Sequence, residues 1–267
     1  MAVPIFVISF NRGHFLRRVI DSYRCQSLDV DVTVVDFGSD DEETLEIIDD
    51  LCRQHDCRLF RLNKINTADE LNTVNVAVSD YFSHTSRDCS YVVTDCDIDL
   101  SMTHRDALSV YSELLGMFDS AECVGPMLKI SDIPRSNPLY NRIMNRQIVQ
   151  FWRREPQWID HRRQSIALLP AVFDTTFALH RSGTPFRRLK RGLRVYWPYE
   201  AQHLDWYYDS EDAHQTTYSR TASSGISHWN GSEQLDMWRH ESLKFDHYTN
   251  VQPGASGAPE AMRVLLT

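Results

Sequence analysis

Short apolar runs alternate with longer amphipathic stretches over the first half of the chain. Four of these runs are rich in β-branched and aromatic residues and are predicted to be β-strands: residues 3–9, 30–36, 58–62 and 90–94. The first stretch between them repeats apolar residues at helical spacing: Phe15, Leu16, Val19, Ile20 and Tyr23. Strands that alternate with helices of this length predict right-handed βαβ units and a mostly parallel sheet.

Further helices are expected over residues 39–55, 68–81 and 103–118. Ser39 stands three residues before Glu42, which is the spacing of a capping box, so we expect Ser39 to begin the second helix. After residue 123 the alternation weakens. Residues 124–130 and 173–180 are predicted to be strands, with a long, irregular section rich in Arg and Trp between them.

The composition fits a globular protein that contains one large domain. The chain has 267 residues, of which 42% are apolar, and this is enough to bury a full core. Its apolar runs are too short to span a membrane, and no basic segment precedes a leader-like core, so we expect a cytoplasmic protein. The six cysteines form no CxxC pair, which favours reduced thiols over structural zinc or a disulfide framework.

The formal net charge of -9 argues against general nucleic-acid binding, which requires a basic surface. Positive charge is nevertheless concentrated in region 142–194. It is carried there by Arg142, Arg146, Arg153, Arg154, Arg162, Arg163, Arg187, Arg188, Lys190 and Arg191. Most of these side chains are expected to be solvated. The alternative is a basic rim that meets an anionic acceptor or makes peripheral contact with a membrane.

An acidic cluster follows the fourth predicted strand directly. Asp95, Asp97 and Asp99 stand at alternate positions, and three like charges this close favour a divalent cation such as Mg²⁺ or Mn²⁺, which would bridge a diphosphate. The alternative is a solvated loop or a helix cap. Residues 9–12 and 36–39 also follow predicted strands. Because ligands of such sheets bind at the carboxyl ends of the strands, we expect all three turns to converge on one crevice.

Three segments together resemble a known family: VPIFVISFNR, VVDFGSDDEE and YVVTDCDIDL. They are similar to the nucleotide-binding half of family-2-type glycosyltransferases with the GT-A fold, over roughly residues 3–130. The resemblance implies a single GT-A domain over residues 1–267, with a Rossmann-like, mostly parallel sheet flanked by helices. Residues 1–130 would bind a nucleotide sugar and residues 131–250 an acceptor, while residues 251–267 are expected to form a mobile tail.

The resemblance also implies an activity. It is the metal-dependent transfer of a sugar from a nucleoside diphosphate sugar to a saccharide or glycolipid acceptor, in the synthesis of surface polysaccharides or glycans. A UDP-sugar is favoured over a GDP-sugar, and the cofactor would be Mn²⁺ or Mg²⁺.

The resemblance assigns the donor-binding roles of the family to individual residues of this sequence. Ser9, Asn11 and Arg12 would hold the base and ribose, Asp36 would bond the base, and Asp95 with Asp97 would contact ribose and metal. Asp36 equally suits a helix cap. The sequence departs from the common pattern at Phe37-Gly38, where a second acidic residue often stands, and at Cys96 inside the DxD motif. Neither change removes a ligand.

The family often recruits a further metal ligand from a C-terminal histidine. His228, in a segment rich in Ser and Gly, is the expected ligand here, with His247 as the fallback; packing against Trp229 is the alternative.

A catalytic base is expected where a helix begins in the acceptor half. The candidates are Asp205 first, then His203 and Glu200, and each suits a helix cap or an acceptor contact equally well. Inverting and retaining mechanisms both stay open. Asp174 and Trp206 are expected at the acceptor, because a carboxylate orients hydroxyls and an aromatic face stacks on a sugar ring; structural roles are the alternative.

Two other functions also fit the pattern of acidic residues at strand ends. A metal-dependent phosphotransferase or nucleotidyltransferase also uses paired carboxylates at strand ends, but the chain has neither GxGxxG nor GxxxxGK, and its acidic pair follows the fourth strand instead of the first. A non-catalytic protein that binds nucleotide sugar or carbohydrate would bind its ligand without releasing a nucleoside diphosphate.

Overall fold

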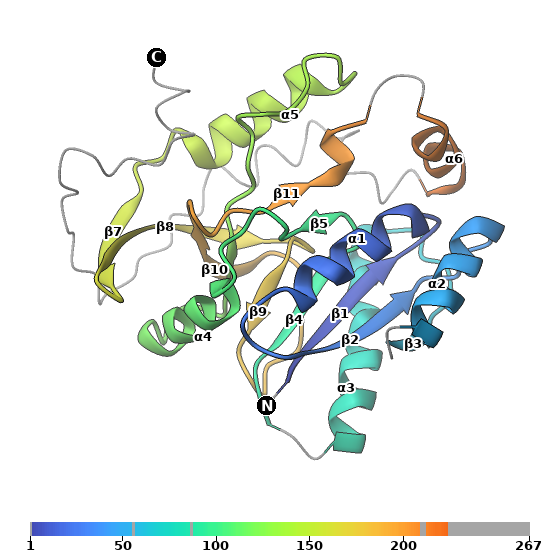
Figure 1. Ribbon diagram of the computed structural model, residues 1–267, viewed down its shortest axis with the longest axis horizontal. Coiled ribbons are helices and arrows are strands. Elements are labelled where there is room, and N and C mark those ends of the chain that lie inside the picture. Colours follow the sequence, from blue (N-terminus) through green and yellow to red (C-terminus); the bar gives the residue numbers. More distant parts are fainter. Residues whose placement is uncertain (1, 55–56, 86–87, 209–211, 224–267) are drawn as a thin grey trace.

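The structure, a computed structural model, describes residues 2–54, 57–85, 88–208 and 212–223 (Figure 1). Its centre is a nine-stranded mixed sheet in the order β3-β2-β1-β4-β9-β6-β10-β8-β7. The strands are β1 (Val3–Ser9), β2 (Val30–Asp36), β3 (Arg58–Arg61), β4 (Tyr91–Asp95), β6 (Cys123–Pro126), β7 (Gln157–His161), β8 (Gln164–Phe173), β9 (Ala178–His180) and β10 (Lys190–Val195). Only β8 and β9 of this sheet run opposite to the others. The predicted α/β class with a mostly parallel sheet is confirmed.

The parallel half of the sheet fixes where the turns begin. Ser9 pairs with Asp36 at the ends of β1 and β2, and Ile8 pairs with Asp95 at the end of β4. The three strands therefore end nearly level, and the turns that follow them start from the same edge of the sheet.

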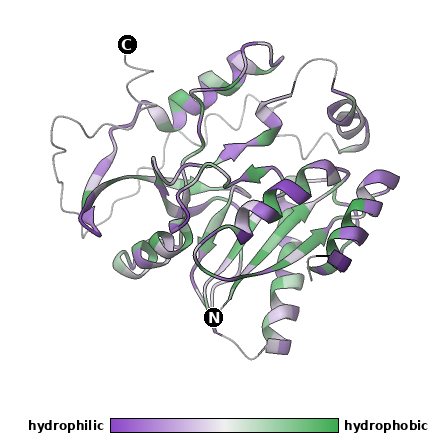
Figure 2. Cartoon of the chain, viewed as in Figure 1, coloured by the Kyte–Doolittle hydropathy of each residue, from purple (hydrophilic) through white to green (hydrophobic). Residues whose placement is uncertain are grey.

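Helices cover both faces of this half of the sheet. They are α1 (Gly13–Arg24), α2 (Glu42–Gln54) and α3 (Val74–Thr85), which follows the 3-10 helix η1 (Ala68–Thr73); α4 (Ala107–Met117) packs further along the sheet, against β6 and β9. Leu16 of α1 belongs to the same buried core as Ile5 of β1, whereas Val74 of α3 packs in a second core with Phe6. Because successive strand residues face opposite sides, β1 is apolar on both, as the colouring of the sheet shows (Figure 2).

The start of α2 differs from the prediction. The backbone N–H of Thr44 donates to Asp41 Oδ2 at 2.9 Å, so Asp41 caps the helix and Ser39 does not. The Ser39 hydroxyl instead donates to Asp36 and accepts from the backbone N–H of Asn11 at 2.9 Å. The predicted capping box is wrong because the turn is longer than its spacing implies. Gly38 adopts a φ of 76° in this turn, a conformation that favours glycine.

The second half contains more regular structure than the sequence predicts. The section expected to be irregular forms α5 (Tyr140–Gln147), the π-helical turn η2 (Ile148–Trp152) and the hairpin β7-β8. The predicted strand over 173–180 is interrupted, because β8 ends at Phe173 and β9 begins at Ala178. The turn between them brings Thr175 against Asp95.

A second, two-stranded sheet carries later residues to the acidic cluster. β5 (Ile98–Asp99) pairs antiparallel with β11 (Gln202–His203), so that His203 lies opposite Ile98. The 3-10 helix η3 (Leu204–Trp206) follows, and α6 (Ala213–Thr221) is the last described helix. None of the helices in the described part of the chain combines the length and apolar character that a membrane crossing requires.

Candidate active site

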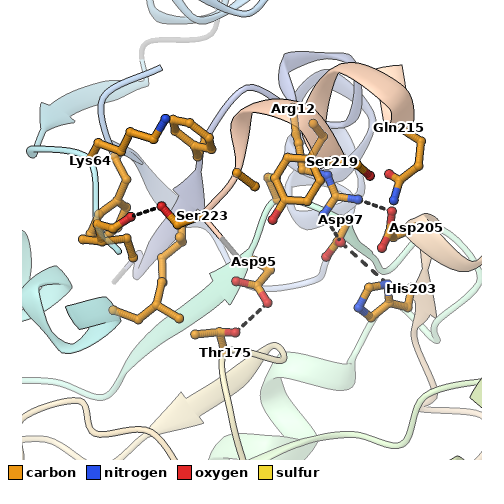
Figure 3. A pocket seen from close by; sticks show the side chains of 18 of the residues that line it. Arg12, Lys64, Asp95, Asp97, Thr175, His203, Asp205, Gln215, Ser219 and Ser223 are labelled. Carbon is orange, nitrogen blue, oxygen red and sulfur yellow. Dashed lines mark hydrogen bonds and ion pairs between the residues drawn. The ribbon is translucent and has the colours of Figure 1, made fainter. Parts of the chain in front are cut away.

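A cavity of about 450 Å³ lies at the carboxyl ends of β1 and β4, under α6 (Figure 3). One part of its wall is apolar and is formed by Ile8, Phe10, Phe37, Ile65 and Leu71. Another part is polar and is formed by Arg12, Asp95, Asp97, His203 and Asp205. The cavity is therefore divided into an apolar region and a polar region with three carboxyl groups, and this division suits a ligand with one flat and one charged part.

Arg12 lies between two of the carboxylates. Its Nη1 donates to Asp97 Oδ2 at 2.9 Å, and its Nη2 donates to Asp205. The residue is only 8% exposed, and its guanidinium packs 4.4 Å from the ring centre of Tyr218. Burial lowers the pKa of Arg12, but Asp205 and Asp97 more than offset this effect and raise it. The guanidinium is thus a permanent cation that fixes both carboxylates.

Three residues of the polar region fit a divalent cation. Asp97, His203 and Asp205 offer ligand atoms that all lie within 4.8 Å of one another. Asp97 Oδ1 and His203 Nδ1 are buried and have no hydrogen-bond partner among the described residues; Nδ1 lies 3.6 Å from Asp97 Oδ2. Buried polar atoms normally have hydrogen-bond partners, so two buried atoms without a partner in one cluster indicate that the cluster binds a ligand. Carboxylate oxygens with one imidazole suit Mn²⁺.

Asp95 lines the cavity beside this cluster but is not one of its three members. Its Oδ2 accepts a hydrogen bond from Thr175 Oγ1 at 2.6 Å, and its backbone N–H donates to the Thr175 carbonyl at 2.8 Å. Burial raises the pKa of Asp95 well above its ordinary value, and the negative charge of Asp97 adds to this effect. The buried Asp95 carboxyl therefore holds a proton more readily than an ordinary aspartate, and Thr175 fixes its position.

Asp99 is tied into the scaffold. Its fully buried carboxylate accepts from Arg18 Nε at 2.8 Å and from the backbone and hydroxyl of Ser101 at 2.9 and 2.6 Å. Asp99 accordingly supports the turn after β5, away from the cavity wall.

The other predicted donor-binding residues hold the turns together. Asn11 Nδ2 donates to Asp40 Oδ1 at 2.6 Å, its Oδ1 accepts from two backbone N–H groups of the β2 turn, and its backbone adopts a φ of 48°. Asp36 binds Ser39, and the Ser9 side chain is buried. The three turns converge as expected, since Asn11 contacts the β2 turn and Arg12 contacts Asp97. Ser9, Asn11 and Asp36 themselves do not line the cavity, so their contacts with nucleotide stay predictions.

The predicted acceptor-side residues are only partly brought together. His203 and Asp205 line the cavity, whereas Glu200 does not and its Oε1 accepts from the backbone N–H of Trp197 at 3.0 Å. Trp206 stacks on His203, with ring centres 4.5 Å apart and an interplanar angle of 2°. Asp174 forms a bidentate pair with Arg188, at 2.6 and 2.9 Å. His228, His247 and the 251–267 tail lie outside the described residues.

Helix α6 covers the cavity, and the sequence did not predict it. Lys64 Nζ donates to the carbonyl of Thr221 at 2.9 Å, and Ser223 Oγ donates to the carbonyl of Ile65 at 3.1 Å, so the end of α6 is bound to the turn after β3. Five residues from this segment line the cavity: Gln215, Tyr218, Ser219, Ala222 and Ser223. The helix has no buried residue and no apolar periodicity, so its only sequence signal is Asp212, whose side chain accepts from the Gln215 N–H at 2.8 Å.

The contact between α1 and α6 is expected to depend on pH. His14 stacks on His214 with ring centres 4.2 Å apart, and burial, His214 and Arg12 lower the pKa of His14 from 6.5 to about 4. Between these values the unfolded chain binds more protons than the folded chain, so stability falls as the pH drops from 6.5 to 4. His14→Phe keeps a stacking ring and should flatten this pH dependence, as measured by urea unfolding at pH 4.5 and pH 7.

The matched control is His84→Phe, because the His84 side chain is 71% exposed. It should leave the pH dependence as in the unsubstituted protein. An equally steep loss of stability in His14→Phe would show that His14 does not contribute.

Comparisons with known proteins give weak structural likenesses. No protein-family model matches the chain, and a search of curated proteins finds no match. Among solved structures, the chain is similar to a mannosyltransferase from Pyrobaculum calidifontis in complex with GDP-Man and Mn²⁺. The identity is 16% and the TM-score is 0.41, with 67% of this chain and 44% of that chain covered. It is similar also to S. aureus TarS 1–349, at 14% identity and a TM-score of 0.40, with 67% and 47% covered.

A third similar structure is GalNAc-T7 with UDP, GalNAc and Mn²⁺, at 13% identity and a TM-score of 0.37, with 48% of this chain and 23% of that chain covered. The chain thus spans less than half the length of each of these proteins. At these values the likenesses establish neither a family nor an activity for this chain, and a functional conclusion has to come from the site.

Proposed function

We propose that the chain is a metal-dependent glycosyltransferase that moves a sugar from a nucleoside diphosphate sugar to a saccharide or glycolipid acceptor. The observation that carries the proposal is the division of one cavity into an apolar region and a cluster of carboxylates and imidazole, at the carboxyl ends of parallel strands. The resemblance of the three motif segments supports the same activity.

The apolar region suits a nucleoside. Phe10 and Ile65 offer flat and aliphatic surfaces for a base, and Lys64 Nζ lies 4.9 Å from the centre of the Phe10 ring. The cavity volume of about 450 Å³ is in the ordinary range for cofactor-sized ligands. The preference for UDP over GDP rests on the resemblance alone.

The polar region suits a diphosphate with its cation. Asp97, His203 and Asp205 would hold Mn²⁺ or Mg²⁺, which when bound offsets the negative charge that develops on the departing diphosphate. Arg12 keeps the carboxylates of Asp97 and Asp205 oriented. Asp95, which lines the cavity beside these residues and is held by Thr175, is placed to contact the donor.

The catalytic base and the acceptor stay predictions. Asp205 and His203 both line the cavity, and whichever of them does not coordinate the cation would be free to accept a proton from an acceptor hydroxyl, while Glu200 is bound to its own turn. Peripheral membrane contact through region 142–194 is also a proposal. Part of that charge is already offset, since Arg162 pairs with Glu113 and Arg187 with Glu122.

A panel of nucleotide sugars tests the proposed function. Purified protein with Mn²⁺ is titrated with UDP- and GDP-sugars by calorimetry, and release of nucleoside diphosphate is followed over time. We expect saturable binding of one nucleotide class, which weakens without Mn²⁺, and slow release of its diphosphate, which is lost without Mn²⁺. The proposal is wrong if no nucleotide sugar binds or is hydrolysed and if Asp97→Ala changes nothing measurable. Binding without any release would favour a non-catalytic protein.

A further inference from the structure

A second, smaller hollow of about 80 Å³ adjoins the main cavity. Asp95, Thr175 and His203 line both, so they form a shared wall. On its far side the hollow is bounded by Gln147 and Gln150, where α5 passes into η2, and by Arg194 of β10. π-Helical turns such as η2 are frequent at functional sites.

Three buried side-chain atoms of the residues that line this hollow have no hydrogen-bond partner among the residues that the structure describes. Gln147 Oε1, Gln150 Nε2 and Arg194 Nε have no hydrogen-bond partner within the described part of the chain. The three residues are only 5%, 8% and 3% exposed, so water does not solvate them from outside. Because folded proteins rarely leave buried polar atoms unsatisfied, three such atoms around one hollow indicate a polar ligand.

The charges around the hollow indicate whether this ligand is an anion or a cation. Arg194 lies between two aromatic rings, 4.5 Å from the centre of Phe151 and 4.3 Å from that of Phe173. Its Nη atoms reach only two backbone carbonyls, both at 3.4 Å, and none of the described carboxylates forms an ion pair with it. Burial lowers the pKa of Arg194 to about 10, so it stays charged near neutral pH.

The nearby carboxylate of Asp174 does not cancel this charge. Arg188 already binds Asp174 through Nε and Nη2, and Arg146 lines the same hollow as Asp174. Burial lowers the pKa of Arg146 too, and the neighbouring cations Arg142 and Arg188 add to this effect while Asp174 opposes it. Three cations, Arg146, Arg188 and Arg194, therefore face at most two carboxylates, Asp95 and Asp174, around the hollow, and an anion would be attracted to it.

We propose that this hollow binds an anionic group, a carboxylate or a phosphate ester, carried by the sugar that lies at the Asp97 cluster. The inference rests on the proposed function, because the shared wall of Asp95, Thr175 and His203 puts the hollow next to the site assigned to the diphosphate. The small volume suits one charged group better than a whole sugar ring. Arg194 and Arg146 supply the charge, and Gln147 and Gln150 supply hydrogen bonds.

The anionic group belongs either to the donor or to the acceptor, and two titrations of the full chain with Mn²⁺ distinguish these sources. The donor arm compares UDP-glucuronate with UDP-glucose, which differ in one carboxylate. The acceptor arm compares glucose 6-phosphate with glucose, with and without UDP. We expect the anionic member to bind at least about 10-fold more tightly in one arm, as a charge-assisted hydrogen bond allows.

Arg194→Gln and Arg146→Gln should each reduce that preference about 10-fold and leave the affinity for the neutral member unchanged. The matched control is Arg191→Gln, because Arg191 lies three residues before Arg194 in the same strand but is exposed. This variant should keep the preference. Thermal unfolding checks that Arg194→Gln is folded, and Arg146, which is partly exposed, provides the second test if it is not.

The inference is overturned if neither arm shows a preference for the anionic member, or if the preference survives both variants. Its failure is distinct from that of the proposed function. Binding of UDP itself reports on the main cavity, and glucose 6-phosphate without UDP reports on the hollow alone.

Discussion

Replacing Arg12 by glutamine is expected to lower the free energy of unfolding by about 3–5 kcal/mol, because removing one partner leaves buried charges uncompensated. Arg12, Asp97 and Asp205 are 8%, 2% and 6% exposed, so water cannot replace the lost cation. Urea unfolding at pH 7 measures the effect. This is the largest change in stability that we expect from one substitution at the site.

The matched control is Arg17→Gln on the same helix. Arg17 pairs with Asp50, but their side chains are 44% and 35% exposed, and such pairs contribute less than about 1 kcal/mol. Mn²⁺ provides a second readout. It should raise the unfolding midpoint of Arg12→Gln more than that of the unsubstituted protein, because it can offset the uncompensated negative charge of the buried Asp97 and Asp205.

A loss of stability no greater than that of Arg17→Gln would contradict the assignment of Arg12 as the cation of this cluster. Equal stabilisation of both proteins by Mn²⁺ would show that the metal does not bind at the carboxylates that Arg12 contacts.

Asp97→Asn is expected to weaken Mn²⁺-dependent binding of nucleotide by at least about 100-fold, since even residues behind metal ligands typically change metal affinity 10- to 100-fold. Asparagine keeps the shape of the side chain and an oxygen for Arg12 Nη1, so the substitution mainly removes charge. Titration calorimetry with UDP measures the effect in the presence and absence of Mn²⁺. The weaker binding without Mn²⁺ should be nearly unchanged, because it depends on the apolar region around Phe10 and Ile65.

Asp69→Asn is the control, since the side chain of Asp69 is 96% exposed. It should bind nucleotide and Mn²⁺ like the unsubstituted protein. If Asp97→Asn kept its full response to Mn²⁺, Asp97 would not be a metal ligand and the cluster would be structural.

The parallel half of the fold could be predicted because its signals are local. The strands over 3–9 and 30–36 have the predicted bounds, since buried strands of a parallel sheet are apolar on both faces and therefore stand out. The hairpin β7-β8 could not be predicted from the sequence. Its turn places Arg162 and Arg163 at φ values of 50° and 65°, positions where glycine or asparagine would have been the usual signal.

The sequence predicts those residues of the candidate site that directly follow the ends of parallel strands. The convergence of Arg12 with Asp97 follows from adjacent parallel strands that end level. The pairing that brings His203 to Asp97 involves two strands of two residues each, too short to leave a pattern, so the sequence pointed to His228 for the imidazole. The α6 cover and the hollow at Arg194 depend on packing between distant segments, which no local pattern records.

One measurement tests the central claim most directly: the anomalous scattering of manganese in crystals grown with Mn²⁺ and UDP. The claim predicts a single strong peak coordinated by Asp97, with His203 and Asp205 as the neighbouring ligands, and the uracil of UDP packed against Phe10 and Ile65. A manganese peak remote from Asp97, or UDP bound outside the cavity between β1, β4 and α6, would contradict it.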